Sequence, residues 1–254
     1  MASAKITNLG NPTLSTDAAT KSYVDSLISV SSPSATRYND YYFILNKYGP
    51  TLWLSAYYKT ALSITTASTT GTTISDLSGN GITTTGTISY SAGTGGNIKL
   101  RLSGTNRILS TANYGTNYTL MVIGSKDNGV SGRLFTSSTG NRLFGWWANI
   151  ARCCYIDTEV YGLASNQSIN TGQEICEVLV NNNGPKDFWE NGIRYLTQTN
   201  NGSNDWGKVS IGQDAIMNEN ATGYMYEVLC FNYSMTNADI ITLRDILVRY
   251  YTFI

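Results

Sequence analysis

The sequence contains no histidine, and this absence limits the catalytic chemistry that remains. Histidine is the usual general base for a serine or cysteine nucleophile and a common zinc ligand, so those mechanisms and most zinc chemistry are excluded. Catalysis by carboxylate groups alone remains compatible with this composition.

Asp157 and Glu159 are two residues apart and would share one face of a strand. Two carboxylates cleave a glycosidic bond with retention only when they lie ~5–5.5 Å apart.

The cysteines do not form a recognised metal or redox motif. The chain has Cys153 and Cys154 side by side and Cys176 and Cys230 alone, and no C-x-x-C pair is present. A zinc ribbon and a thioredoxin-like motif are therefore excluded. We expect free thiols that pack as small apolar groups, with a Cys176–Cys230 disulfide as the open alternative.

Two loops of the sequence are rich in the oxygen-bearing side chains that bind calcium. Asp76, Ser78 and Asn80 imitate the first ligands of a calcium-binding loop, but Thr87 stands where the twelfth-position acid belongs. An Asx-type turn that satisfies its own backbone is the preferred interpretation. A weaker hypothesis places calcium at a second polar loop, and no other cofactor is expected. That loop contains Asp214, Asn218 and Glu219.

Aromatic side chains near expected turns are the candidates for glycan binding. An aromatic face offers a large contact area at low entropic cost, and neighbouring Asn or Asp side chains can bind sugar hydroxyls. Core packing is the competing interpretation for each tryptophan. If Trp146 and Trp147 lie on a strand, they point to opposite faces. The candidates are Trp146, Trp147, Trp189, Tyr195 and Trp206.

The composition excludes several classes of partner. Charged residues make up 13% of the 254 residues, and 17 basic residues balance 17 acidic ones. The sequence has no excess of positive charge that would attract nucleic acid, so we expect no nucleic-acid partner. No apolar stretch approaches the ~20 residues that span a bilayer, and no signal peptide is visible, so we expect no membrane insertion. The polarity comes from Ser, Thr, Asn, Gly and Tyr, which favour short strands and turns.

Residues 1–30 form a small unit with an extended start and a short helix. Asn11-Pro12 indicates a turn, and Thr16 can cap a helix of ~13 residues, which is marginal alone in water. The helix must therefore pack on the rest of the chain or on copies of itself. The apolar residues expected to anchor it or to oligomerise are Ile6, Leu9, Tyr23, Val24, Leu27 and Ile28.

This segment closely resembles a short repeat of phage tail fibres, head fibres and structural proteins of large viruses. The repeat has the form I-T-N-L-x-x-P-x-x-x-x-D-A-A-T-K-x-Y-V-D. The resemblance implies a virion fibre protein, usually a homotrimer, that docks onto other virion proteins by its N-terminal end. An ordinary capped helix in an unrelated protein is the alternative. The matching residues are Ile6-Thr7-Asn8-Leu9, Pro12, Asp17-Ala18-Ala19-Thr20-Lys21 and Tyr23-Val24-Asp25.

The remainder of the chain predicts a linker at 31–37 and one β-rich domain at 38–254. Asn191-Gly192 between two apolar runs indicates a hairpin. Thr236 begins a capped amphipathic helix whose apolar face should cover the sandwich, with Ile240, Leu243, Leu247 and Tyr250 at helical spacing. The predicted strands cover 98–102, 119–124, 174–180, 187–190, 193–195, 209–212 and 224–231.

The order of these sequence features along the chain resembles their order in the concanavalin A-like, laminin G-like domains. The resemblance implies a mainly β fold, an antiparallel jelly-roll sandwich. It covers most of 50–254, and because this fold serves lectins, glycosidases and structural domains, it leaves the function open. The features that carry it are the turn Asp76-Leu77-Ser78-Gly79-Asn80-Gly81, the hairpin Trp189–Tyr195, Ile211-Gly212, Gly223, Glu227-Val228 and the closing helix 236–250.

Glucanases with this fold carry Glu-x-Asp-x-Glu on one strand, and the nearest match here is incomplete. It runs from Tyr155 to Glu159, and Tyr155 stands in the place of the first acid. Either the nucleophile or the acid would be missing, so we do not expect an enzyme.

The sequence therefore favours a protein of the virion surface, assembled in the host cytoplasm. It would be a tail fibre, head fibre or spike component, anchored by its N-terminus, that displays a lectin-like sandwich to host-surface glycans. The alternative is a capsid decoration or minor capsid protein whose sandwich is purely structural.

Overall fold

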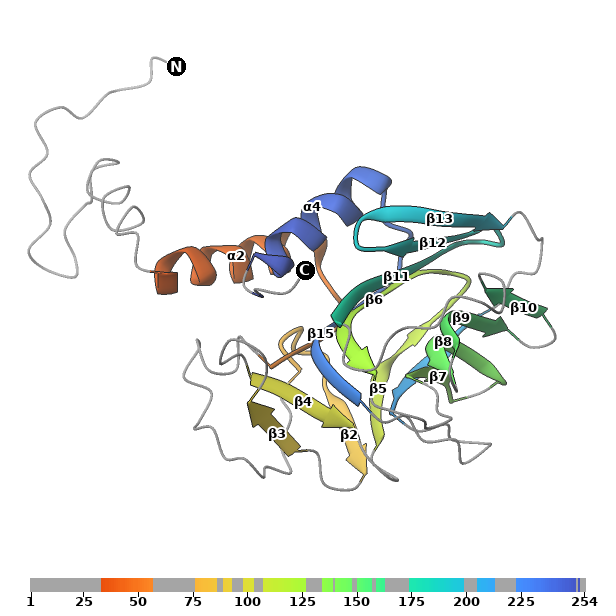
Figure 1. The fold of residues 1–254 in the computed structure, drawn as a ribbon, viewed down its shortest axis with the longest axis horizontal. Helices are drawn as coiled ribbons and strands as arrows, with labels where there is room; N and C mark the ends of the chain where they lie inside the picture. Colours follow the sequence, from red (N-terminus) through yellow and green to blue (C-terminus); the bar gives the residue numbers. More distant parts are fainter. Residues whose placement is uncertain are drawn as a thin grey trace, which may run out of the picture.

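The chain forms two antiparallel β-sheets, and two helices lie along the outer face of one of them (Figure 1). The computed structural model describes residues 33–56, 76–85, 89–92, 98–102, 107–126, 134–138, 140–147, 150–156, 159–162, 174–198, 205–212, 223–249 and 251. The eight-stranded sheet has the order β13-β12-β11-β6-β15-β4-β3, with β1 also paired to β15. The seven-stranded sheet has the order β10-β9-β8-β7-β14-β5-β2.

The strands of the eight-stranded sheet are β1 (Leu52–Ser55), β3 (Ser89–Ala92), β4 (Ile98–Leu102), β6 (Asn117–Lys126), β11 (Glu174–Asn182), β12 (Lys186–Glu190), β13 (Ile193–Gln198) and β15 (Gly223–Phe231). Those of the seven-stranded sheet are β2 (Ile82–Thr85), β5 (Arg107–Tyr114), β7 (Phe135–Ser137), β8 (Arg142–Trp147), β9 (Ile150–Ile156), β10 (Glu159–Gly162) and β14 (Gly207–Ile211).

This architecture confirms the mainly β, antiparallel sandwich that the sequence predicts. Each predicted strand lies within or largely overlaps one of the observed strands. The predicted hairpin is also present, between β12 and β13. Asn191 and Gly192 have φ values of 50° and 84°, and positive φ at both central residues is what a tight two-residue hairpin turn requires.

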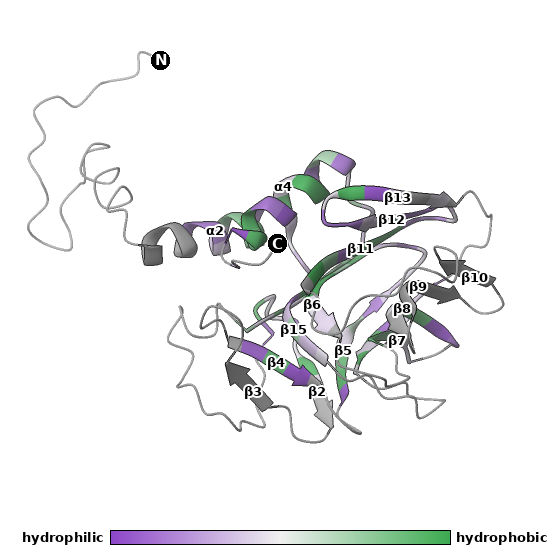
Figure 2. Cartoon of the chain, in the orientation of Figure 1, coloured by the Kyte–Doolittle hydropathy of each residue, from purple (hydrophilic) through white to green (hydrophobic). Residues whose placement is uncertain are grey.

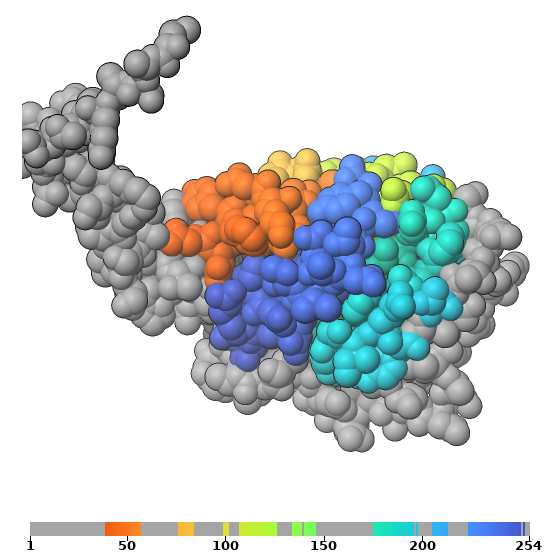
Figure 3. Space-filling model, turned by 90° about the horizontal axis from the view of Figure 1, so that it is seen from above, coloured from red at the N-terminus to blue at the C-terminus, as the bar shows by residue number. Residues whose placement is uncertain are grey.

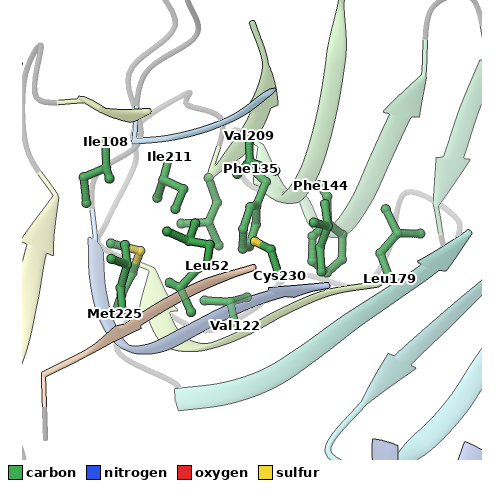
Figure 4. Close-up of a cluster of buried hydrophobic side chains, with 14 of the residues drawn as sticks. Leu52, Ile108, Val122, Phe135, Phe144, Leu179, Val209, Ile211, Met225 and Cys230 are labelled. Carbon is green, nitrogen blue, oxygen red and sulfur yellow. The ribbon is translucent and has the colours of Figure 1, made fainter. Parts of the chain in front are cut away.

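The inner faces of the two sheets enclose one hydrophobic core. Figure 4 shows Phe135, Phe144 and Val209 of the seven-stranded sheet above Val122 and Cys230 of the eight-stranded sheet. Alternate residues of β6 enter this core, as the period of two in a strand requires. The residues between them face the other way, into a second hydrophobic cluster.

That second cluster lies beneath the helices α2 (Pro33–Tyr48) and α4 (Asn237–Val248). The two helices lie side by side over the sheet (Figure 3). They are antiparallel, since Lys47 Nζ is 3.3 Å from Asp239 Oδ1 at one end and Arg249 Nη1 is 3.6 Å from Asp40 Oδ2 at the other. Neither helix, nor any other in the described ranges, is long and apolar enough to cross a membrane.

The C-terminal helix α4 begins as the sequence predicts. The Thr236 hydroxyl accepts a hydrogen bond from the Asp239 N–H at 3.2 Å, and it donates one to Asp239 Oδ2 at 2.7 Å. This side-chain cap satisfies a backbone donor that the helix leaves without a partner. Ile240, Leu243 and Leu247 are buried against the sheet, also as predicted, while Tyr250 lies outside the described residues.

The linker predicted at 31–37 is wrong from Pro33 onward, because α2 begins there. Proline is favoured in the first turn of a helix, where its missing N–H would have no partner in any case. Further along α2, Ile44 and Tyr48 are buried in the cluster beneath the helices, and Tyr41 packs against it. The predicted helix at 1–30 and its six anchor residues lie outside the described residues.

The two described cysteines are free thiols, as expected. Cys230 belongs to the core between the sheets, whereas Cys176 belongs to the cluster beneath the helices. The two side chains therefore point to opposite faces of one sheet, and a Cys176–Cys230 disulfide is excluded. The side chains of Cys153 and Cys154 lie outside the described part of the chain.

A buried carboxyl group joins β15, β1 and the C-terminal end of the chain. Glu227 accepts hydrogen bonds from Trp53 Nε1 at 2.9 Å, from the Ser55 hydroxyl at 2.7 Å and from the Tyr251 hydroxyl at 2.6 Å. A bulge between Met225 and Glu227 interrupts the alternation of β15 at this point. Burial raises the pKa of Glu227 to about 7, and the three hydrogen bonds act in the opposite direction.

Replacing Glu227 by Gln should make folding less dependent on pH. The folded chain binds this proton more tightly than the unfolded chain, so the contribution is fully present below pH 4.5 and is lost as the pH rises through about 7. A pKa change from 4.5 to about 7 corresponds to about 3 kcal/mol. Urea unfolding at pH 4.5 and pH 8 should show a larger fall in unfolding free energy for the wild type than for Glu227→Gln. Equal falls would contradict the assignment, and Asp245→Asn, at an exposed carboxyl, is the control.

Candidate functional site

The turn at residues 76–81 uses both of its carboxylate oxygens within the chain. Asp76 Oδ1 accepts from the backbone N–H groups of Trp53 and Ser78, each at 2.9 Å. Asp76 Oδ2 accepts from the Ser78 hydroxyl at 2.7 Å and from the Gly81 N–H at 2.9 Å. The Asn80 side-chain amide donates to the Thr51 carbonyl at 3.1 Å, which ties the turn to the residue before β1.

This geometry supports the interpretation of the turn as an Asx-type structure. N–H and O–H donors occupy the carboxylate, so the oxygens that a calcium ion would need already have partners. No group of three or more His, Cys, Asp or Glu residues suited to a metal occurs among the described residues. The second calcium candidate, at Asp214, Asn218 and Glu219, lies outside them.

Two of the aromatic candidates are part of the protein interior, and their selection as glycan-binding residues is corrected. Trp206 has no exposed surface and packs edge-on against Tyr118 in the core between the sheets. Its indole N–H donates to the Thr136 carbonyl at 3.2 Å. Trp189 is only 6% exposed and lies in the cluster beneath the helices. Large aromatic side chains contribute most when buried, which is why core packing prevails at both positions.

Of the other three candidates, the structure describes the side chain of Tyr195 alone. Tyr195 is 39% exposed on the edge strand β13. It occupies a register irregularity between β12 and β13, and bulges of this kind redirect a side chain. The backbones of Trp146 and Trp147 belong to β8, and their side chains lie outside the described part of the structure. Tyr195 is thus the one aromatic candidate that the structure describes as exposed.

The structure describes only part of the carboxylate pair that the sequence offers for hydrolysis. Glu159 begins β10, and Asp157 lies outside the described residues. A different pair, Glu177 and Glu190, is directly opposite in the register of β11 and β12. These two residues are 2% and 5% exposed, so a polysaccharide cannot reach them. The sequence reading missed this pair because only the strand register reveals it.

A second cluster that the sequence reading missed lies where β4 pairs with the beginning of β15. Arg101 is opposite Tyr224 in the register, and Leu100 is opposite Met225. Leu100 and Met225 belong to the core between the sheets. Alternation along the strands therefore puts Lys99, Arg101 and Tyr224 on the outer face.

The two cations of this cluster gather on a single aromatic ring. Lys99 Nζ is 3.7 Å from the centre of the Tyr224 ring, and Arg101 Cζ is 4.9 Å from it. The Arg101 guanidinium also donates a hydrogen bond to the Tyr224 hydroxyl. Both distances are within the range of a favourable cation–π contact. All three side chains are partly exposed, so the cluster is open to solvent and to a ligand.

No protein-family model and no curated protein matches the sequence. Solved structures match the fold. Domain 4 of a GH43 extracellular arabinanase from Geobacillus stearothermophilus, solved in complex with arabinotriose, has a TM-score of 0.56 at 17% identity over 77% of this chain and 98% of that chain. The binding domain of botulinum neurotoxin DC, solved in complex with SialylT, has a TM-score of 0.53 at 14% identity over 78% of this chain.

The same toxin domain in complex with rat synaptotagmin II has a TM-score of 0.52 at 15% identity. This chain spans about half of the toxin binding-domain chains, 51% in both structures. At these identities the likeness establishes the sandwich fold alone, and the neighbouring domains are ones that bind carbohydrates or receptors.

Replacing Asp76 by Ala should lower the free energy of unfolding by about 3 kcal/mol, because it leaves several N–H and O–H donors of the turn without their acceptor. The matched control is Asp245→Ala, since the Asp245 side chain is 56% exposed and pairs with the neighbouring Arg244. That control should change stability by less than about 0.5 kcal/mol. Urea unfolding measures both variants. If the free energy of unfolding falls no more for Asp76→Ala than for the control, the hydrogen bonds of Asp76 do not stabilise the fold.

Proposed function

We propose that this chain is a virion surface protein, a fibre or spike component that attaches the particle to host-surface glycans. Its first thirty residues would dock onto other virion proteins, and its sandwich would bind the glycan. The resemblance of residues 5–28 to the viral fibre repeat is the sequence basis of the proposal. Assembly would take place in the host cytoplasm, with no membrane insertion and no catalytic step.

The observation that carries the proposal is the way α2 joins the fibre-type segment to the sandwich. α2 begins at Pro33, only a few residues after that segment ends. Tyr41 of α2 stacks on Trp53 with ring centres 5.1 Å apart, and Lys47 pairs with Asp239 of α4. The connection is helical from Pro33, and the helix packs on the rest of the protein from Asp40 to Tyr48. A segment fixed to a particle would thus hold the sandwich through a structured joint, as a display role requires.

The solved structures with the same fold favour binding as the task of the sandwich. The arabinanase domain was solved with arabinotriose and the toxin domain with SialylT, so this architecture has held a ligand in both proteins. Here we propose a host-surface glycan as the ligand. Binding through a shallow sugar site is weak for one copy. Several copies on a fibre would turn later contacts into intramolecular ones, with a gain of ~10²–10⁴-fold.

A capsid decoration role is the second candidate, and one surface feature favours it. Several large apolar side chains are about two-fifths exposed or more, which suits contacts with neighbouring shell proteins. They are Tyr42, Phe43, Ile193, Tyr195 and Ile241. In that case the sandwich would be structural and would bind no sugar.

A glycan array probed with the full chain separates the two candidates. We expect the labelled protein to bind a defined subset of glycans, because a sandwich used for attachment must recognise a host sugar. Heat-denatured protein is the control for adhesion that does not need the fold. A silent array with folded protein would favour the decoration role.

The mass of the full chain in solution tests the oligomeric state. A homotrimer of a 27.7 kDa chain should give about three times that mass by light scattering. Substituting both Tyr23 and Leu27 by Ser should reduce the mass to that of a single chain, because these are apolar residues of the predicted helix. A wild-type monomer would contradict the trimeric fibre role.

A further inference from the structure

Helix α2 carries large apolar side chains on two opposite faces. Tyr41, Ile44 and Tyr48 face the sheet and lie in or against the hydrophobic cluster beneath the helices. Tyr42 and Phe43 are each 42% exposed. Figure 2 shows that hydrophilic and hydrophobic residues both occur along α2 and its neighbour α4. A helix with large apolar groups all round is normally buried all round, so the outward face of α2 needs an explanation.

The exposed side of α2 has the spacing of a coiled-coil seam. Steps of three and four residues keep side chains on one side of a helix, and residues spaced in this way pack between helices that associate along their length. Helix α4 lies on a different side of α2, because it pairs with Asp40 and Lys47. The four exposed residues at i, i+3, i+4 and i+7, which we call the outer seam, are Asn39, Tyr42, Phe43 and Asn46.

The two aromatic rings of the outer seam are held by neighbours on their own helix. The Tyr42 ring lies edge-on to Tyr41 with ring centres 5.1 Å apart, and the Phe43 ring lies edge-on to Tyr48 at 5.9 Å. Lys47 Nζ is 5.4 Å from the centre of the Phe43 ring, a favourable cation–π distance. Side chains that are already ordered lose less entropy when another surface covers them. The outer seam is thus suited to contact with a partner.

The place where α2 begins indicates which partner can reach the outer seam. The helix begins at Pro33, and the three steps from residue 30 to Pro33 span at most about 11 Å. In the proposed fibre, copies of this chain associate through residues 1–30. Their α2 helices would therefore begin close together, and Phe43 is only about 15 Å further along the helix. A second copy of this chain is the partner that this connection brings to the seam.

We propose that the outer seams of three copies pack together along one axis and form part of the trimer interface, an inference that rests on the proposed function. Because the seam is opposite the face that packs on the sheet, each sandwich would lie outside this axis. Asn39 and Asn46 would lie within the interface. Polar residues at seam positions fix the register and the number of helices at a cost in stability, so the seam would act together with residues 1–30.

Disulfide cross-linking of the full chain tests the contact between copies. In Asn46→Cys the new thiols of two copies would meet at the axis, and mild oxidation should give linked pairs of chains on a non-reducing gel. The matched control is Lys208→Cys, at an exposed residue on β14 of the other sheet, which should remain a single chain. The wild type measures the background from the native cysteines, of which Cys176 and Cys230 are buried.

A charge placed in the outer seam should break this contact. Added to Asn46→Cys, Phe43→Glu should lower the cross-linked fraction about tenfold, because three carboxylates would face one another at the axis. Within one chain the new carboxylate precedes Lys47 by four residues, a favourable helical pair, so the fold should be retained. The matched control is Ile241→Glu, since Ile241 is also 42% exposed but lies on α4, and it should leave cross-linking unchanged. Thermal unfolding confirms that each variant is folded.

Each outcome decides between the claims. A wild type that is trimeric by light scattering, with no cross-link in Asn46→Cys, overturns the seam and leaves the fibre role standing. Cross-linking that Phe43→Glu does not lower also overturns the seam. A monomeric wild type overturns both the seam and the trimeric fibre role. If no cross-link forms and particles lack the Phe43→Glu variant but contain Ile241→Glu, the outer seam binds another virion protein and the assignment to a second copy is wrong.

Discussion

Burial of the central strands of the eight-stranded sheet on both faces is the constraint on which the rest of the structure depends. In β15, Val228 and Cys230 enter the core between the sheets, while Leu229 and Phe231 lie beneath the helices. Such a strand cannot leave a polar side chain without partners, so Glu227 is held by three donors at its bulge. The helix cover that completes this burial includes α2, the helix that follows the fibre-type segment. If the proposed function is correct, attachment and folding are linked through this one helix.

The sequence predicted those parts of the fold that local chemistry determines. The alternation at 98–102, the Asn191-Gly192 turn and the Thr236 cap each have a short-range cause, and each is present in the structure. The turn at Asp76 was also interpreted correctly, since its hydrogen bonds satisfy its own backbone. Helix α2 was missed because its apolar residues have a weak helical pattern and its start contains Pro33. Proline in a small, polar segment indicates a linker, but it is equally suited to the first turn of a helix.

The candidate site was less predictable, because it depends on pairing between distant segments. Trp189 and Trp206 lie in or next to expected turns, as a sugar-binding aromatic residue would, yet Trp206 is buried between the sheets and Trp189 beneath the helices. Lys99 and Arg101 were visible as charges on one face of a strand, but Tyr224 joins them only through the register of β4 with β15. A period of two indicates which side chains share a face. It does not indicate which strand will lie beside them.

The central claim is that the chain is fixed to a particle by its N-terminal segment and presents the sandwich outward. Its most direct test is electron microscopy of intact particles labelled with an antibody fragment against the β12–β13 hairpin, whose Ile193 is 60% exposed. The account predicts label on the outside of the particle, at the tips of fibres or spikes. Label that appears only after the particles are broken open, or that stays in the unassembled fraction, would contradict it.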